Sequence, residues 1–131
     1  MEKFAVYLSV ALGSALGGMG RYWLTGLVSG RMRESFPWGT LVVNVTGSFI
    51  IGLLAALPEP EARWLAGLSF RPFLMVGICG GYTTFSSFSL ETLGLLRNGE
   101  MLQAGANVMA SVFLCLIAVW LGHTAGQALN R

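Results

Sequence analysis

The sequence predicts an all-α membrane protein with four transmembrane helices per chain, in a single transmembrane domain over residues 1–131. Of these residues, 54% are hydrophobic and only 11% are charged, whereas a soluble domain carries about 25% charged residues. The charges also leave four apolar stretches near the roughly 20 residues that a spanning helix needs. These stretches are about 4–28, 38–57, 70–95 and 101–127. Because they fill most of the chain, we expect no soluble domain.

The first two stretches carry signals for helix packing and for a helix start. Gly13, Gly17 and Gly20 recur at a spacing that lets two helix backbones approach closely. Arg21 interrupts the first stretch only near its far end. The second stretch opens with Pro37-Trp38, in which proline suits the first turn of a helix and tryptophan suits the membrane interface. We therefore expect close packing along the first helix and a defined start to the second.

The third stretch contains the run GICGGYTTFSSFSLE at 77–91, which is unusual for a membrane helix. Its three glycines and the β-branched Thr83 and Thr84 lower helix propensity in mid-span. We expect this helix to break in mid-membrane and to free backbone carbonyls, which can coordinate a small cation. The alternative is that the glycines only allow a neighbouring helix to pack closely.

Polar side chains form stripes along three of the four stretches, each at the three- to four-residue spacing of one helix face. The stripes are Thr40, Asn44 and Ser48 on the second stretch, Thr84, Ser87 and Glu91 on the third, and Gln103, Asn107, Ser111 and Cys115 on the fourth. A single stripe is better explained by hydrogen bonds between helices. Polar groups in a membrane are costly unless they find partners, which makes them candidates for a function. Three stripes together with almost no charge favour the lining of a path.

The residues along this path suit a small, hard anion. Asn amides and Ser or Thr hydroxyls donate hydrogen bonds, and an aromatic ring is electropositive at its edge. Phe85 and Phe88 lie three residues apart, so their rings project from nearly the same side of the helix. No fixed cation would trap the anion, and conduction requires binding that is weak enough for release. The alternative is that both rings are ordinary packing residues.

The basic residues predict how the chain is oriented. With four spans, one side of the membrane holds Lys3, Arg63, Arg71 and Arg131. The other side holds Arg31, Arg33 and Arg97, together with Arg21 if the first helix ends near it. Orientation follows the Lys and Arg bias of short loops, and here that bias is close to zero. We therefore expect dual topology, in which the chain inserts both ways and can form an antiparallel dimer. The alternative is that one loop carries a bias that this count misses.

The helix signatures resemble those of the Fluc (CrcB) family of fluoride channels. The run from Gly80 to Ser89, GGYTTFSSFS, is similar to that family's highly specific signature. The segment Pro37 to Asn44, PWGTLVVN, resembles its second-helix motif, and Gly13 to Arg21 resembles its first helix. The resemblance covers the whole chain in size and in four-helix layout. On the fourth helix the match is weaker, since Cys115 stands where a Gly, Ser or other small residue is expected.

The resemblance implies a passive, selective fluoride channel that exports cytoplasmic fluoride and relieves its toxicity. The channel would be a dual-topology antiparallel homodimer with two pores, in the bacterial inner membrane and in contact with membrane lipid. Carried over by position, the fluoride pathway comprises Asn44, Phe85, Phe88, Thr84, Ser87, Ser111 and Glu91, with Arg21 at a pore entrance. Backbone carbonyls of Gly80 and Thr83 from both subunits would hold a structural sodium ion. No organic cofactor and no nucleic acid partner are implied.

Other functions fit the sequence less well. A small proton-coupled multidrug exporter needs a membrane-embedded carboxylate, typically in the first helix, and the only candidate here is Glu91 in the third. A membrane scaffold would explain the glycines but not the polar stripes or the paired rings. An enzyme is not expected, because His123 is the only histidine and has no nucleophile or carboxylate at a recognisable spacing. Cys79 and Cys115 both fall inside expected spans, so we predict neither a disulfide nor a metal site from them.

Overall fold

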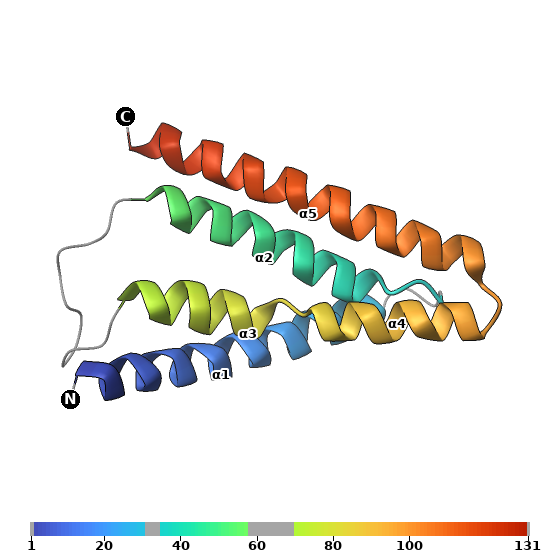
Figure 1. The fold of residues 1–131 in the computed structure, drawn as a ribbon, viewed down its shortest axis with the longest axis horizontal. Helices are drawn as coiled ribbons and strands as arrows, with labels where there is room; N and C mark the ends of the chain where they lie inside the picture. The colour runs from blue at the N-terminus through green and yellow to red at the C-terminus, as the bar shows by residue number, and fades with distance from the viewer. Residues whose placement is uncertain (1, 31–34, 58–69, 131) are drawn as a thin grey trace.

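The computed structural model describes residues 2–30, 35–57 and 70–130, and the ordered elements in these ranges are all helices (Figure 1). The elements are α1 (Glu2–Ser29), α2 (Trp38–Ala56), the π-helix η1 (Pro72–Cys79), the short α3 (Gly80–Tyr82), α4 (Phe85–Arg97) and α5 (Met101–Leu129). The prediction of an all-α protein is therefore confirmed for the described residues. The described ranges do not include some of the basic residues on which the predicted orientation depends, namely Arg31, Arg33, Arg63 and Arg131.

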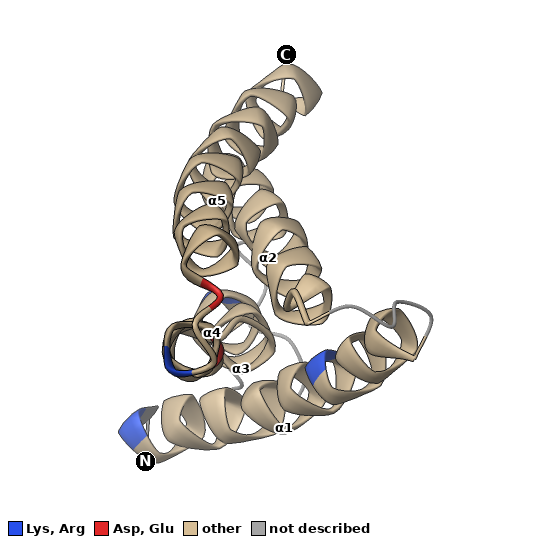
Figure 2. Cartoon of the chain, turned by 90° about the vertical axis from the view of Figure 1, so that its right-hand side faces the viewer, with Lys and Arg blue, Asp and Glu red and all other residues tan. Residues whose placement is uncertain are grey.

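Three segments of the described chain are long and apolar enough to cross a membrane. They are α2, α5 and the stretch Pro72–Arg97, which runs from η1 to α4. These segments indicate a multi-pass membrane protein. Helix α1 is 28 residues long but falls outside this set. Its assignment as a fourth span stays a prediction. Figure 2, which looks along the helices from one end, shows that nearly all of the described ribbon is uncharged.

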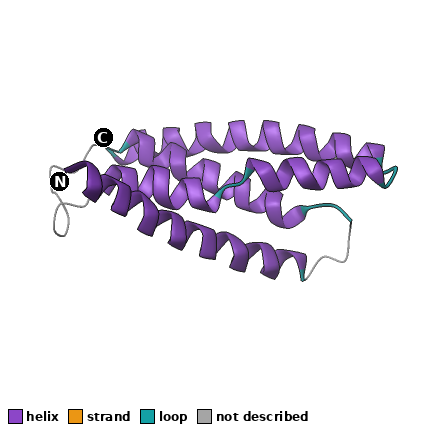
Figure 3. Ribbon diagram, turned by 60° about the horizontal axis from the view of Figure 1, so that its bottom comes forward, coloured by secondary structure: helices purple, strands orange, loops and turns teal. Residues whose placement is uncertain are grey.

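The third expected stretch is not one continuous helix. Helix α3 ends at Tyr82 and α4 begins at Phe85, and the two residues between them have extended backbones, with ψ of 157° at Thr83 and 113° at Thr84. Branching at Cβ favours such extended conformations. Figure 3 shows the interruption as a short loop between two helical segments. We call Thr83 and Thr84 the helix break.

The helices pack as two close pairs, in which glycines let one backbone approach another. In the first pair, α1 packs against η1 and α3, and a Cβ on Gly13 or Gly17 would collide with the Phe73 or Ile78 carbonyl oxygen. The close approach predicted for these two glycines is confirmed. Gly20 differs, because a Cβ there would make only an ordinary contact, 3.7 Å from the Tyr82 ring.

The second pair consists of α2 and α5, which lie side by side along their lengths (Figure 1). A Cβ on Gly52 would meet the Val119 carbonyl oxygen, and a Cβ on Gly122 would meet the Phe49 carbonyl oxygen. Glycines on both helices are therefore required for the spacing of this pair. The first pair carries the helix break and the second carries two of the polar stripes, so their contact sets the geometry of the site.

We predict that Gly122→Ala lowers the free energy of unfolding in detergent by about 1–3 kcal/mol, because the added methyl group must displace the α2 backbone. Gly105→Ala on the same helix is the matched control, since a Cβ there meets no atom within 4 Å. The control should be neutral or stabilising by up to about 1 kcal/mol, the difference in helix propensity. Thermal unfolding of both variants measures the difference, and equal midpoints would contradict the proposed role of Gly122.

Candidate functional site

The helix break is held by a side chain from α2. The Thr84 backbone N–H donates to Asn44 Oδ1 at 2.8 Å, and Asn44 Nδ2 donates to the Thr84 carbonyl oxygen at 3.1 Å. The side-chain amide of Asn44 therefore satisfies both the N–H and the carbonyl of Thr84, as the backbone of a neighbouring β-strand would. This pairing matters because an unpaired backbone group inside a membrane costs several kcal/mol. One Nδ2 hydrogen of Asn44 remains after these bonds.

Both carbonyls that the sequence singled out as cation ligands lose their helical partners at the break. In a continuous α-helix the Gly80 carbonyl would accept from the Thr84 N–H, and the Thr83 carbonyl from the Ser87 N–H. Here the Thr84 N–H donates to Asn44, and the Ser87 N–H donates to Thr84 Oγ1 at 3.1 Å. The Thr83 carbonyl instead receives a long hydrogen bond of 3.5 Å from Arg21 Nη1.

Thr84 also starts the helix that follows the break. Its hydroxyl oxygen accepts the Ser87 N–H as an N-cap, which replaces one of the hydrogen bonds missing at a helix start. Its hydroxyl hydrogen donates to Ser87 Oγ at 3.1 Å. Thr84 is only 7% exposed. The break is thus fixed from both sides, by Asn44 on the backbone and by Thr84 itself on α4.

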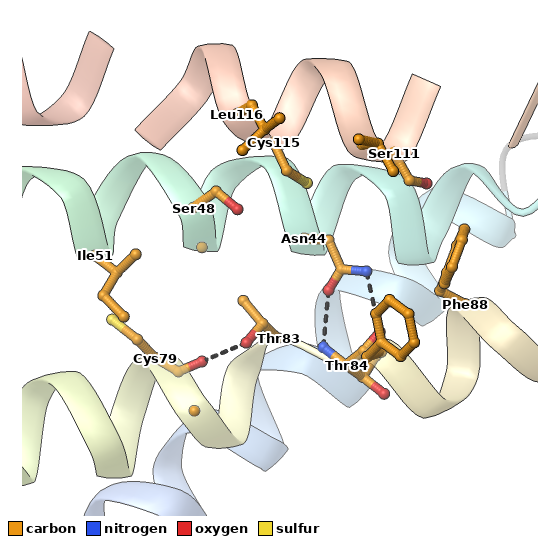
Figure 4. Close-up of a pocket in the computed structure, with 14 residues that line it drawn as sticks. Asn44, Ser48, Ile51, Cys79, Thr83, Thr84, Phe88, Ser111, Cys115 and Leu116 are labelled. Atoms are coloured by element: carbon orange, nitrogen blue, oxygen red, sulfur yellow. Dashed lines mark hydrogen bonds between the residues drawn. The ribbon is translucent and has the colours of Figure 1, made fainter. Parts of the chain in front are cut away.

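A hollow of about 410 Å³ lies on one side of the break (Figure 4). We call it the aromatic cleft, and its lining includes Asn44, Gly80, Thr83, Thr84, Phe85, Phe88 and Ser111. Its remaining lining residues are also uncharged. Most of the predicted pathway therefore converges on one hollow that offers neutral donors and aromatic rings but no ionised side chain.

The two phenylalanine rings border this cleft as a tilted pair. Their centroids are 5.2 Å apart and their planes meet at 51°. Phe88 is 8% exposed, whereas Phe85 is 79% exposed in the single chain. The tilt of an aromatic pair directs ring edges as well as faces toward neighbouring groups. Phe88 is therefore part of the packed interior, and Phe85 presents its ring outside the chain.

A second hollow, of about 750 Å³, lies beyond the break and contains the predicted residues that the aromatic cleft lacks. We call it the carboxylate hollow, and its lining includes Arg21, Thr40, Thr84, Ser87 and Glu91. Thr84 lines both hollows. The Thr40 hydroxyl donates to Glu91 Oε1 at 2.7 Å, and Glu91 Oε2 is buried without a hydrogen-bond partner among the described residues. The sequence placed Thr40 and Glu91 in separate stripes, and only the fold pairs them.

The stripe on α5 divides between the cleft and the helix interface. Ser111 and Cys115 line the aromatic cleft. Asn107, at 1% exposure, instead donates from Nδ2 to Thr92 Oγ1 at 2.9 Å and joins α5 to α4. Sequence reasoning missed Thr92, although its position one turn after Phe88 on the same helix face was a usable signal. Gln103 accepts a 2.8 Å hydrogen bond from Ser35 Oγ and lies away from both hollows.

The glycines at the break have different roles. A Cβ on Gly77 would collide with the Gly13 backbone, and one on Gly81 with the Ser14 backbone, as the close-packing interpretation of the sequence expects. Gly80 differs, because the nearest atom to its Cβ would be the Met75 carbonyl oxygen at 3.9 Å. Close packing within the chain therefore explains Gly77 and Gly81 but does not explain Gly80.

Comparison with known proteins assigns a family. A sequence model described as "CrcB-like protein, Camphor Resistance (CrcB)" matches residues 8–123. The chain belongs to the CrcB family. A relative from Opitutus terrae named "Fluoride-specific ion channel FluC" is 60% identical over 96% of this chain and 96% of its own. Relatives of the same name from Methylocella silvestris and Rhodospirillum rubrum are 54% and 56% identical, each over 95% of this chain and over 95% and 97% of their own.

Membership of the CrcB family confirms the resemblance that the helix signatures indicated. The expectation that the chain is not an enzyme is also confirmed, since these relatives are named as ion channels. The matched range includes the helix break and both hollows. The roles of individual residues in this CrcB protein stay predictions. The geometry shows which of the predicted residues lie together.

We predict that Asn44→Ala lowers the free energy of unfolding of this CrcB protein in detergent by about 1–3 kcal/mol, because it leaves the Thr84 N–H and carbonyl without their partners. Ser48→Ala, one turn further along the same helix face, is the matched control and should unfold within about 0.5 kcal/mol of the wild type. Thermal unfolding monitored by circular dichroism measures both. A wild-type midpoint for Asn44→Ala would show that the amide is not needed to hold the break.

Proposed function

We propose that this chain is a passive fluoride channel that exports fluoride from the cytoplasm and so relieves fluoride toxicity. The names of its relatives support the substrate, because three proteins 54–60% identical to the chain are each called a fluoride-specific ion channel. We further propose that residues 1–131 form one transmembrane channel domain with four spans, α1 included, in the bacterial inner membrane. In this arrangement the helix break lies near the middle of the membrane.

The aromatic cleft is the observation that carries this proposal. Phe85 and Phe88 form a tilted pair beside neutral donors, and the cleft has no ionised side chain in its lining. Ring edges and the remaining Asn44 amide hydrogen replace part of the hydration shell of a small anion. The Thr83, Thr84 and Ser111 hydroxyls donate within the chain, so they reach an anion only by rotating away from these partners. A fixed Lys or Arg in the cleft would hold the anion tightly, whereas this lining allows release.

The route continues from the aromatic cleft toward the carboxylate hollow. Thr84 lines both hollows, and Ser87 lies next to it with a hydroxyl that accepts from Thr84. Ser111 extends the polar lining on α5. Arg21 lines the carboxylate hollow and attracts anions there. We assign Glu91 to this end of the route, where the Thr40 hydroxyl holds one of its oxygens.

We propose an antiparallel, dual-topology homodimer with two pores as the functional unit. Phe85, a predicted fluoride ligand, is 79% exposed in the single chain. A ring this exposed does not enclose an ion by itself, and a second chain packed on this face would cover it. Gly80 lies on the same cleft, and a Cβ there would make only an ordinary contact, 3.9 Å from the Met75 carbonyl oxygen, so packing within the chain does not require a glycine at this position. Both features suit a surface that a second chain completes.

The residues at the break fit the structural sodium ion that the family implies. Hard cations prefer oxygen ligands, and carbonyls of an unwound helix segment coordinate sodium in membrane transporters. The N–H groups that would occupy the Gly80 and Thr83 carbonyls in a helix are bonded to Asn44 and to Thr84 Oγ1. The Thr83 carbonyl keeps one long hydrogen bond of 3.5 Å, from Arg21 Nη1, and its second lone pair remains for an ion. We propose that these two carbonyls, from both chains, hold the ion, which supplies a positive charge at the dimer centre.

Fluoride efflux from liposomes tests the proposed function. Purified protein is reconstituted into vesicles loaded with potassium fluoride, valinomycin carries the counter-ion, and a fluoride electrode records release. We expect rapid fluoride efflux and no chloride efflux from matched potassium chloride vesicles. Folded protein that releases no fluoride would contradict the proposal. Proton-coupled drug transport, the alternative function, would then be tested with Glu91→Gln.

We predict that Phe85→Ile and Phe88→Ile each lower fluoride efflux about tenfold or more, because they remove the ring edge and keep much of the side-chain volume; a loss of about 1.4 kcal/mol is sufficient for a tenfold effect. Phe113→Ile is the matched control, since Phe113 is exposed on α5 and lines neither hollow. Gel filtration in detergent verifies assembly. Wild-type efflux in both cleft variants would exclude the rings from the pathway.

We predict that replacing sodium with the larger caesium ion weakens the dimer and lowers efflux, because the carbonyls at the break suit a small cation. The fraction of dimer after dilution in detergent is measured by chemical crosslinking in each salt. Lithium chloride and choline chloride at the same concentration are controls for ionic strength. Equal dimer fractions in sodium, caesium and choline would contradict a structural sodium site.

A further inference from the structure

A hydrogen bond joins Tyr82, the last residue of α3, to Thr46 on α2, and the proposed pathway uses neither residue. The two hydroxyl oxygens are 2.8 Å apart. The Thr46 hydroxyl also donates to the Val42 carbonyl oxygen of its own helix, at 2.8 Å. Because a hydroxyl has only one hydrogen and that of Thr46 goes to Val42, Tyr82 is the donor. The bond therefore connects the chain just before the helix break to α2.

The Tyr82 ring lies between α1 and α2, at glycines on both helices. A Cβ on Gly47 of α2 would lie 3.0 Å from Tyr82 Cδ1, and a Cβ on Gly20 of α1 would lie 3.7 Å from Cδ2. The backbone is also close to α1, since a Cβ on Gly17 would lie 2.8 Å from the Tyr82 nitrogen. Packing thus gives the ring a fixed place, from which the hydroxyl reaches Thr46.

The peptide group between Thr83 and Thr84 has a second anchor on α2. The Thr83 carbonyl and the Thr84 N–H belong to this one peptide group, which is planar and trans, so the two point in opposite directions. The Thr84 N–H donates to Asn44 Oδ1 at 2.8 Å. The Thr83 carbonyl therefore points away from Asn44. Its direction is set by Asn44 on one side of the break and by the position of Tyr82 on the other.

The contacts of Thr83 couple its position to that of Tyr82. The Thr83 N–H and hydroxyl both donate to the Cys79 carbonyl oxygen, at 3.0 Å and 2.9 Å, and Figure 4 shows the hydroxyl bond. A Cβ on Gly47 would collide with the Thr83 methyl group, so this residue lies against α2 as well. Thr83 is thus tied to the last turn of α3, which ends at Tyr82. A displacement of that turn would change where the Thr83 carbonyl points.

We propose that Tyr82 is a positioning residue for the cation site, whose hydroxyl, bonded to Thr46, holds the Thr83 carbonyl where a small cation fits. This inference rests on the proposed function and on its sodium ion. Selection between cations depends on the number of ligands and on how rigidly they are held. Loss of the Tyr82 hydroxyl would let the carbonyl move, and sodium would lose more than a larger cation does. In the proposed arrangement the break lies near the middle of the membrane, where no water replaces the lost bond.

The experiment measures the fraction of dimer by chemical crosslinking in detergent while sodium chloride replaces choline chloride at constant ionic strength. A parallel titration uses caesium chloride. The proteins are the wild type, Tyr82→Phe, Thr46→Val, Thr46→Ser and the double variant Tyr82→Phe/Thr46→Val. Tyr7→Phe is the matched control, since Tyr7 is 73% exposed near the start of α1. Gly122→Ala is the control for a loss of stability away from the break.

We expect Tyr82→Phe and Thr46→Val each to raise the sodium concentration at half-maximal dimer about threefold or more, the effect that one hydrogen bond between membrane helices supports. The preference for sodium over caesium should fall in both. The double variant should show no larger shift than the single ones, because each removes the same bond. Thr46→Ser keeps a hydroxyl and should behave as the wild type, as should Tyr7→Phe. Gly122→Ala should leave the sodium midpoint unchanged.

Four results would overturn the proposal. Equal sodium midpoints in wild type and Tyr82→Phe would show that the hydroxyl does not position the carbonyl. An equal loss of dimer in all three salts would make its role purely structural. Additive shifts would show that Tyr82 and Thr46 act separately, and a wild-type dimer indifferent to sodium would leave no cation site to position.

Fluoride efflux from liposomes, measured on the same proteins, separates this inference from the proposed function. A shifted sodium midpoint in Tyr82→Phe, together with no fluoride efflux from the wild type, would contradict the fluoride channel and still support the role of Tyr82. Fluoride efflux from the wild type with an unshifted midpoint in Tyr82→Phe would support the channel and overturn the positioning role.

Discussion

The pairing of the Asn44 amide with the Thr84 backbone is the interaction on which the rest of the site depends. A membrane offers no water to satisfy the peptide groups of an interrupted helix, so a break persists only where another group replaces the lost hydrogen bonds. Asn44 does this with both ends of its amide. By accepting the Thr84 N–H, it also leaves the Gly80 carbonyl without its helical donor. One side chain therefore stabilises the break and defines the backbone oxygens that the break exposes.

This pairing requires α2 to lie at a fixed distance from the break, and glycines provide that distance. A Cβ on Gly47 would collide with the Thr83 methyl group, so α2 reaches the break only because residue 47 has no side chain. The backbone of α1 contacts that of η1 and α3 because residues 13, 17 and 81 are glycines. The backbones of α2 and α5 are in contact for the same reason, at Gly52 and Gly122. Packing of two rigid helix pairs, rather than charge pairing, positions the polar groups.

The polar residues divide into those that hold the structure and those that face open space. Asn107 and Thr92 tie α5 to α4, and Thr84 caps α4, so part of each stripe serves helix packing. Ser111, Cys115 and the two rings remain on the aromatic cleft. Of the two interpretations weighed from the sequence, interhelical hydrogen bonding thus holds for Asn107. The lining of a path stays a prediction for the residues that face the cleft. Thr84 holds the structure through its backbone, which pairs with Asn44, and it also lines both hollows.

The sequence by itself determined the helical class and the positions of three apolar segments, and it marked Thr83 and Thr84 as a weak point in one of them, because hydropathy, glycine content and β-branching act locally along the chain. The signature around Phe85 was also sufficient to identify the family. Only the tertiary structure decided that Thr40 hydrogen-bonds to Glu91 and that the Asn44 amide pairs with the Thr84 backbone. It also decided that the polar stripes divide between two hollows. Helix periodicity tells which residues share a face, but it does not tell which face meets which neighbour. That choice depends on the rotation and spacing of whole helices, which close backbone contacts at glycine fix only when the chain is folded.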